Sequence, residues 1–451
     1  MNETPENIST KIDFSSSSFK KYLANTSWLF FERILRIIIS FVVTIFVVRY
    51  LGPKDFGLYS YVLSFFWLFG SLSTVGLEAI STREIVKHPE KRDEINGTVF
   101  FLRLIGSITA IALITITLLI TGEDTFTSIL ILIVSGSFLF QSFSVIEYYF
   151  RGKVEAKYNA YALSASVIFS SILKVIFILI KAPLIYFVLA VVFEYVALAM
   201  GLVTVYQFNK LSIFNWNYSK KLASSLLKDS WPLMLSGIVV MVYVRIDQIL
   251  IKHLISEEAV GYYAVAARLS EAWYFIPVTL CNSIFPAIVN AKNISEEFYN
   301  NRLQKLYDLL AWSAIGIAVP ITIFSNEIIS LLFGSEFSQA SPVLTIYIWA
   351  GVAVFLGVAS SQYLINENLT KLSFIRNFVG MVLNVILNLI MIPLYGIIGS
   401  AIATLISYSV IAFALSFHRK FVLQFKMMMK SIFLITLFQY IKDVFISKRK
   451  I

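Results

Sequence analysis

The chain has 451 residues, of which 58% are hydrophobic and only 14% charged, and its formal net charge is +10 at pH 7. The charged share is about half of the ~25% that soluble domains carry, so the composition excludes an ordinary soluble enzyme and a disordered or fibrous protein. A membrane protein with many spans is left. Its apolar stretches are long enough for helices, whereas barrel strands are shorter and alternate.

Cysteine and histidine give no sign of a metal centre. The single cysteine, Cys281, excludes a disulfide within the chain and argues against a cysteine-based metal site. The three histidines are scattered without the spacing of metal ligands: His88, His253 and His418. We therefore expect no metal and no cofactor, apart from coupling to H⁺ or Na⁺.

Twelve apolar stretches are long enough to cross a hydrocarbon layer of ~30 Å, and each must be a helix because lipid offers no partner to open backbone groups. They cover residues 28–49, 57–80, 98–121, 127–148, 159–180, 182–207, 230–252, 260–289, 306–325, 341–365, 372–394 and 396–417. The sequence predicts an all-α polytopic membrane protein with twelve transmembrane helices.

These spans divide into two six-helix bundles, at 28–207 and 230–417, joined by a linker at 208–229. Residues 1–27 form a polar segment without the features of a cleavable signal. Residues 418–451 form a basic tail, in which 431–441 is interpreted as an interfacial amphipathic helix. A thirteenth span at 431–441 is the alternative.

Basic residues predict the orientation. With the N-terminus in the cytoplasm, 27 of the 37 Lys and Arg residues fall in cytoplasmic segments. Only four fall in outer loops: Arg49, Lys54, Lys181 and Lys252. This asymmetry places both termini in the cytoplasm and the protein in the cytoplasmic, or inner, membrane. The net charge then reflects orientation and contact with membrane lipid, and no nucleic-acid partner is expected.

The two halves share short matches. RYLGPKDFGLYSY at 49–61 is echoed by KHLISEEAVGYYA at 252–264, which pairs Gly57 with Gly261. Because each half has six spans, the repeats would be parallel and related by an axis along the membrane normal. Two such bundles with a site between them form a transporter architecture. Coincidence among hydrophobic helices is the alternative.

Ten charged residues inside the predicted spans are the candidates for a functional site, because charge is costly there and marks function. They are Glu32, Arg33, Arg36, Arg103, Lys174, Glu194, Arg245, Asp247, Arg268 and Glu271. Arginine forks suit phosphate, so the arginines are expected to line a cationic cavity for an anionic cargo: Arg33, Arg36, Arg103, Arg245 and Arg268. The candidates for ion or proton coupling are three carboxylates: Glu194, Asp247 and Glu271.

Several of these charges also have structural interpretations. Arg33 and Arg103 lie near a cytoplasmic span end, from which a long side chain can snorkel. Two pairs have the spacing of neighbours on one helix face, Glu32 with Arg36 and Arg268 with Glu271.

Other charges lack a partner on their own helix. Arg245 and Asp247 are two residues apart and face different directions, so at least one needs a partner on another helix. Glu194 has no partner along its own helix, and Lys174 is expected to reach the outer interface.

Five segments carry a family resemblance. They are RYLGPKDFGLYSY, GLEAISTREIVK, EYYFRGKVEAKYNAYA, RIDQILIKHLISEEAVGYYAVAARLSEAWYFIP with the following SIFPAI, and NVILNLIMIPLYGIIGSAIATLIS. In this order they resemble the polysaccharide-exporter, or O-antigen, branch of the multidrug/oligosaccharidyl-lipid/polysaccharide (MOP) superfamily. The similarity extends from about residue 20 to 418. The matching positions are Gly52, Pro53, Gly57, Tyr59, Arg245, Asp247, Gly261 and Tyr263.

The resemblance implies a flippase and not an enzyme. Its cargo would be an undecaprenyl-diphosphate-linked oligosaccharide for O-antigen (lipopolysaccharide), capsule or exopolysaccharide. The two halves would alternate access and carry the cargo from the cytoplasmic to the outer leaflet, often with an ion gradient. A polysaccharide polymerase and a chain-length regulator are possible partners.

Three alternatives remain open. A multidrug cation antiporter of the same superfamily would have an acidic cavity, against which the basic excess argues. A peptidoglycan-precursor flippase usually has fourteen spans, two more than are predicted here. A membrane glycosyltransferase or polymerase needs a large outer loop with catalytic residues, and the longest outer loop has only Glu327 and Glu336.

Overall fold

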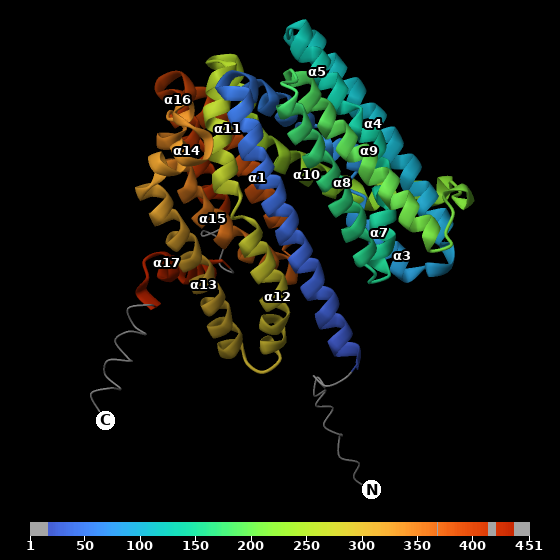
Figure 1. The fold of residues 1–451 in the computed structure, drawn as a ribbon. Coiled ribbons are helices and arrows are strands. Elements are labelled where there is room, and N and C mark those ends of the chain that lie inside the picture. The colour runs from blue at the N-terminus through green and yellow to red at the C-terminus, as the bar shows by residue number, and fades with distance from the viewer. Residues whose placement is uncertain (1–16, 368, 414–420, 437–451) are drawn as a thin grey trace, which may run out of the picture.

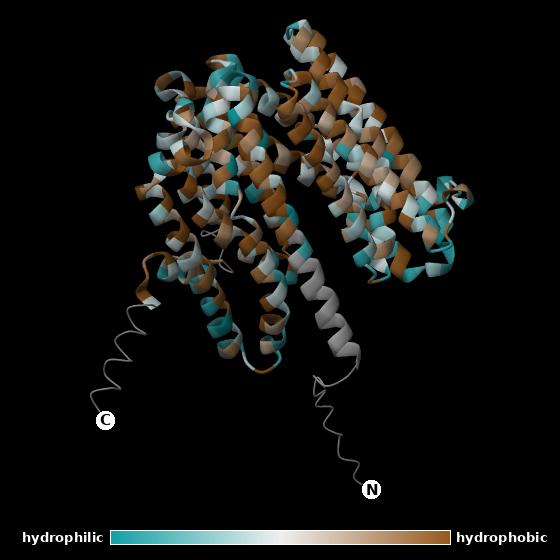
Figure 2. Ribbon diagram, viewed as in Figure 1, coloured by the Kyte–Doolittle hydropathy of each residue, from teal (hydrophilic) through white to brown (hydrophobic). Residues whose placement is uncertain are grey.

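The computed structural model describes residues 17–367, 369–413 and 421–436, and the side chains of these residues except 17–31, 33 and 370. Within these ranges the regular structure is entirely helical. Ten helical segments are long and apolar enough to cross a membrane, so the chain is a multi-pass membrane protein, as predicted. Figure 2 shows hydrophobic residues along these helices and hydrophilic residues gathered toward their ends.

The described part of the first half contains nine α-helices, several of which are short. They are α1 (Ser17–Leu68), α2 (Gly70–Thr74), α3 (Glu78–Lys87), α4 (Arg92–Thr121), α5 (Thr125–Ser135), α6 (Ser137–Gln141), α7 (Val145–Gly152), α8 (Lys157–Leu179) and α9 (Leu184–Phe208). The second half contains α10 (Lys220–Leu254), α11 (Glu257–Glu271), α12 (Phe275–Lys292), α13 (Glu296–Ile323), α14 (Ser325–Phe333), α15 (Ala340–Asn366), α16 (Thr370–Phe413) and α17 (Val422–Ile432).

Two of the long helices contain a non-helical glycine, and each therefore consists of two arms. α1 changes direction at Gly52 (φ 70°), directly before Pro53, and α16 at Gly396 (φ 61°). Glycine adopts this positive φ without the steric cost of a side chain. In α16 the two arms fold back on each other, as the hydrogen bond from Ser400 Oγ to Asn388 Oδ1 at 2.6 Å shows. The ten apolar segments therefore include two that each cover a pair of predicted spans.

Other predicted spans are interrupted. The span at 127–148 is split into α5, α6 and α7, and the span at 260–289 is split between α11 and α12. Helix α10 begins inside the predicted linker, and α17 begins earlier than the predicted tail helix at 431–441. Part of that predicted helix, 437–441, lies outside the described residues, as do 418–420 of the basic tail.

The two halves lie side by side, with α1 and α10 between them (Figure 1). The largest buried cluster joins the halves, because it contains Phe56, Tyr61 and Phe66 of α1 together with Val260 and Tyr263 of α11. Separate clusters fill the interior of each half. The second arm of α1 therefore acts as a packing surface between the halves.

Candidate functional site

A cavity of about 660 Å³ lies between the halves. The first half contributes Trp67, Glu78 and Arg151, and α10 of the second half contributes Gly237 and Met241. An ion pair joins Arg151 to Glu78 at this cavity. Of the five arginines predicted to line a cationic cavity, the four whose side chains the structure describes, Arg36, Arg103, Arg245 and Arg268, are not among its lining residues. The cavity between the halves is therefore not lined by these arginines, although the sequence predicted them there.

Arg245, Arg268 and Glu271 lie together where α10 and α11 approach the second arm of α1. Arg245 Nη1 lies 3.8 Å from Glu271 Oε2, so this pair joins α10 to α11. The guanidinium of Arg268 lies over the ring of Phe56, 5.1 Å from its centroid. The predicted pair of Arg268 with Glu271 is not formed, because the partner of Glu271 comes from the neighbouring helix. Arg268 instead makes a cation–π contact between the halves.

Asp247 is 2% exposed and lies at the centre of a polar cluster within the second half. Its carboxylate accepts hydrogen bonds from the Tyr263 hydroxyl at 2.5 Å, Thr404 Oγ1 at 2.7 Å and Asn388 Nδ2 at 2.9 Å. The expectation that Asp247 or Arg245 needs a partner on another helix holds for both residues.

The Asp247 cluster has the chemistry of a hard-cation or proton site. Its groups are a carboxylate, hydroxyls and amides from α10, α11 and both arms of α16, and oxygen ligands are those that hard cations take. Asn384, fully buried one turn before Asn388, has neither amide atom bonded within the described chain. These unbonded atoms leave capacity for one more bound group.

The remaining predicted charges lie in the first half. Arg103 is 2% exposed, and its Nη1 donates to the Tyr148 hydroxyl at 2.6 Å. It lies in the core between α4 and α7 and neither snorkels nor faces the other half. Tyr148 on α7 supplies a neutral hydrogen-bond partner for this buried guanidinium.

Arg36 and Glu32 form the predicted pair along one helix face, at 3.2 Å. Ser164 of α8 donates to Glu32 at 2.5 Å, so the pair is anchored within the first half. The side chain of Arg33 is outside the described residues, and its role stays a prediction.

Glu194, which has no partner on its own helix, is paired with Lys174, which the sequence analysis expected to reach the outer interface instead. Lys174 Nζ on α8 lies 3.5 Å from Glu194 Oε2 on α9. Two oppositely charged groups on packed helices pair inside a membrane because each alone would leave an uncompensated charge in lipid. The contact could not be found from spacing along one helix.

The halves are held together at one end by two basic residues that the internal repeat pairs with each other. Lys252, at the end of α10, forms an ion pair with Glu123 in the turn between α4 and α5. The Tyr61 hydroxyl also donates to Glu123, at 2.6 Å. In the reciprocal contact, Arg49 donates from Nε to the carbonyl of Leu332 in α14 at 2.8 Å. Each basic residue thus reaches across to the other half, and we call these contacts the outer latch, after the predicted outer loops to which Arg49 and Lys252 belong.

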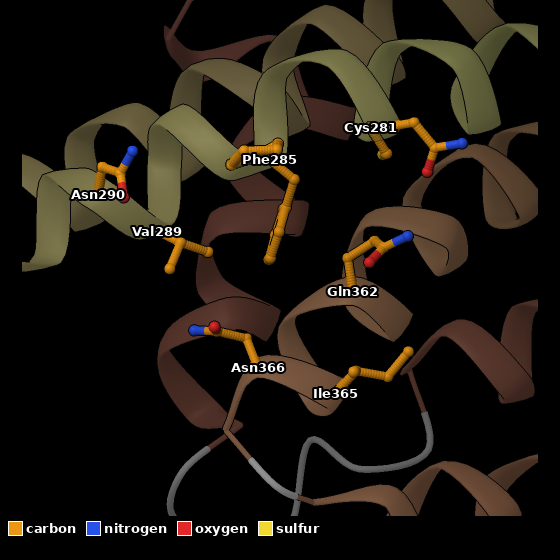
Figure 3. A pocket seen from close by; sticks show the side chains of 9 residues that line it. Cys281, Phe285, Val289, Asn290, Gln362, Ile365 and Asn366 are labelled. Atoms are coloured by element: carbon orange, nitrogen blue, oxygen red, sulfur yellow. The ribbon is translucent and has the colours of Figure 1, made fainter. Parts of the chain in front are cut away.

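A second cavity, of about 420 Å³, lies within the second half between α12 and α15. Figure 3 shows Phe285 and Val289 of α12 projecting toward Gln362 and Ile365 of α15. Its polar lining consists of carboxamides and the Cys281 thiol: Cys281, Asn282, Asn290, Gln362 and Asn366. None of its lining residues in the described part of the chain is charged, so it is separate from the predicted cationic site.

One buried basic residue was missed by the sequence interpretation. Arg376 was counted with the cytoplasmic loops, yet it lies in α16 and is only 3% exposed. Its position six residues into a predominantly apolar helix could have indicated burial. It was assigned to the loop because it lies close to the loop in the sequence.

Comparison with known proteins shows which families and structures this chain resembles. The family described as "Polysaccharide biosynthesis protein" matches residues 22–292, and the family described as MatE matches residues 232–390. The chain is 30% identical over 222 residues to a protein of Haloferax volcanii named "Probable low-salt glycan biosynthesis flippase Agl15". That alignment covers 48% of this chain and 44% of the relative.

Two solved structures share the fold over most of their length. A lipid II flippase, MurJ, in an inward closed conformation superposes with a TM-score of 0.69 at 19% identity, covering 93% of each chain. An inward-facing multidrug resistance MATE transporter of the MOP superfamily superposes with a TM-score of 0.67 at 16% identity, covering 86% of this chain and 94% of that one. At these identities the likeness concerns the fold.

Proposed function

Because the chain belongs to the polysaccharide biosynthesis protein family of the MOP superfamily, we propose that it is a flippase for a lipid-diphosphate-linked oligosaccharide. One structural observation carries the proposal. The outer latch holds the halves together at one end, while the 660 Å³ cavity separates them where Glu78 and Arg151 lie. A molecule closed at one end and hollow at the other is one of the two states that alternating access requires.

The proposed crossing pattern has twelve spans, with each arm of α1 and of α16 crossing once. Both termini then lie in the cytoplasm, and the cavity between the halves opens to the cytoplasmic side. The latch residues Arg49 and Lys252 lie on the outer side, in agreement with their positions in predicted outer loops. The cargo would enter from the cytoplasmic side and leave after the latch opens.

Within this scheme we assign the cargo diphosphate to Arg245 and Arg268. Arg245 is 28% exposed and only loosely paired with Glu271, so its fork is free to bind an anion. Arg268 covers Phe56 at the contact between the halves and is uncovered when that contact opens. Arg36 and Arg103 are engaged within the first half and are left out of the cargo site.

Asp247 is the proposed coupling residue. Its cluster binds H⁺ or Na⁺ between α10 and the two arms of α16, and a change of charge there shifts the packing of these helices. Glu194 and Glu271 are less suitable because each already faces a basic residue.

The proposal for the identity of the cargo is based on the family resemblance found in the sequence. We propose an undecaprenyl-diphosphate carrier with an O-antigen, capsular or exopolysaccharide repeat unit, moved across the cytoplasmic membrane and passed to a polymerase with its chain-length regulator. The relatives named above are a flippase of glycan biosynthesis, a lipid II flippase and a multidrug transporter, and none is named as an enzyme.

Translocation of a fluorescent undecaprenyl-diphosphate oligosaccharide in reconstituted vesicles tests the proposal. We expect wild-type protein to exceed empty vesicles, and Arg245→Ala with Arg268→Ala to lower the rate about tenfold or more, since each loses a charge-assisted contact of about 1.5–3 kcal/mol. Parallel assays with a peptidoglycan precursor and with a cationic drug test the two alternatives. Wild-type translocation no faster than in empty vesicles would overturn the flippase assignment.

A further inference from the structure

Arg376 is held inside the second half by hydrogen bonds from one side only. Its Nη1 donates to Ser360 Oγ at 2.9 Å, and its Nη2 donates to Ser361 Oγ and to the Gly357 carbonyl, the latter at 3.4 Å. All three acceptors belong to α15. Its Nε is buried and has no hydrogen-bond partner in the described structure. The guanidinium is thus fixed in position while part of its donor capacity remains unused.

The positive charge of Arg376 is uncompensated within the described part of the chain. Its acceptors are neutral, and no carboxylate of the residues described pairs with it. An arginine stays protonated in proteins, and an unpaired charge at membrane depth is costly. Arg36 differs, because it has Glu32, and Arg245 differs, because it has Glu271. A missing counter-charge points to an anion that comes from outside the chain.

A cavity of about 220 Å³ lies beside this guanidinium, between α10, α15, α16 and the turn that precedes α12. Its walls include three tyrosines, Tyr243, Tyr274 and Tyr408, together with Asn377 next to Arg376. The Tyr274 hydroxyl is buried and makes no hydrogen bond to the described residues. The rings of Tyr243 and Tyr408 meet edge to face, with centroids 5.6 Å apart.

These groups have the chemistry of a small anion-binding site. A guanidinium supplies charge and directed donors, and tyrosine hydroxyls supply further donors. Aromatic walls offer an apolar face on which a sugar ring can pack. The volume is below the ~300–1,000 Å³ of pockets for drug-sized ligands, so it fits one charged group with a single ring rather than a whole oligosaccharide.

We propose that Arg376, with Tyr243, Tyr274 and Tyr408, binds an anionic group of the glycan cargo, either a carboxylate of an acidic sugar or a phosphate. This inference rests on the proposed function and extends it, because it makes the second half selective for a charged glycan. The site is distinct from Arg245 and Arg268, which are assigned to the diphosphate.

A purely structural role would have a different signature. In that case Arg376 would serve only to tie α16 to α15, and the cavity would show no preference for anions. Arg376→Gln keeps hydrogen bonds to Ser360 and Ser361 possible while removing the charge. The two roles are therefore separable without unfolding the protein.

The test uses charged thiol reagents on full-length protein with Cys281→Ser and Asn377→Cys. An anionic sulfonatoethyl and a cationic trimethylammonioethyl methanethiosulfonate are compared at the introduced thiol, with and without Arg376→Gln. With Arg376 present, we expect the anionic reagent to react faster than the cationic one. In Arg376→Gln the ratio of the anionic to the cationic labelling rate should fall by about tenfold, the order expected for one charge a few ångströms away. An unchanged ratio in a variant with an unaltered melting temperature would refute the site.

Protection from labelling then identifies the source of the anion. Protection by glucuronate with none by pyrophosphate assigns an acidic sugar, and the reverse assigns a phosphate. The proposal is contradicted if neither anion protects at any concentration below that at which salt in general begins to change the labelling rate. None of these readouts requires translocation, so a failure of the flippase assignment is distinguishable from a failure of this site.

Discussion

Gly57 lies against Gly261 where the second arm of α1 crosses α11. A β-carbon on Gly57 would collide with the carbonyl of Glu257 and lie 2.8 Å from the amide nitrogen of Gly261. A β-carbon on Gly261 would likewise collide with the carbonyl of Pro53. These are the two glycines that the internal repeat pairs with each other, so equivalent helices of the two halves cross at equivalent positions. The contact joins the halves near the outer latch.

Gly57→Ala is expected to weaken the closed contact by about 1–3 kcal/mol, the usual cost of inserting a methyl group into a packed interface. The shift is measured as faster labelling of Ala259→Cys by an impermeant maleimide, in a Cys281→Ser background, because Ala259 is buried in the closed contact. Gly316→Ala is the matched control, since nothing lies within 4 Å of its added carbon. Equal labelling in the two variants would contradict a contact that opens.

The latch gives a charge-swap prediction. The side chains of Lys252 and Glu123 are only 12% and 3% exposed, so Lys252→Glu leaves unsatisfied groups and should destabilise the closed end by about 1–3 kcal/mol. Adding Glu123→Lys should restore part of the loss. Labelling of Ala259→Cys reports closure in all three proteins.

Lys54→Glu provides the control for the swap, because Lys54 is an exposed residue of the same outer turn. It should leave labelling unchanged. If the double variant labels as fast as the sum of the single variants predicts, the two residues are not coupled and the latch is wrong.

Asp247→Asn should remove ion coupling while the fold persists, because an amide can occupy the same hydrogen-bonded position. We expect Na⁺ to raise the melting temperature of the wild type relative to choline, and the difference to vanish in Asp247→Asn. Asp308→Asn is the control, since Asp308 is another buried carboxylate, bonded by Ser431 Oγ at 2.6 Å. A pH-dependent but Na⁺-independent melting temperature that is lost in Asp247→Asn would identify H⁺ as the ion.

Arg103→Met should affect stability more than transport. Its loss leaves the buried Tyr148 hydroxyl unpaired, at a cost of about 1–3 kcal/mol. Tyr148→Phe should be at least as costly, because it leaves the buried Arg103 guanidinium without this hydrogen-bond acceptor and with only the ring 5.5 Å away. The melting temperature and the translocation rate per folded molecule separate the effects. A normal melting temperature with lost translocation would return Arg103 to the cargo site.

The sequence by itself determined the properties that depend on residues close in the chain. Apolar length was sufficient to predict spanning helices, because each backbone must satisfy its own hydrogen bonds in lipid. Helical spacing was sufficient for the pair of Glu32 with Arg36. The predicted spans 372–394 and 396–417 leave one residue between them to reverse the chain, and the structure reverses it at the adjacent Gly396. The repeat also placed Gly57 and Gly261 as equivalents.

Only the tertiary structure decided which charges meet across helices. Lys174 pairs with Glu194, and Arg245 with Glu271, because packed helices bring together residues that no one-dimensional spacing relates. The same packing left Arg376 buried against neutral acceptors beside a cavity, although its place in the sequence resembles a loop residue. In a membrane every buried charge needs a partner, and the choice of partner is made by helix packing rather than by position along the chain.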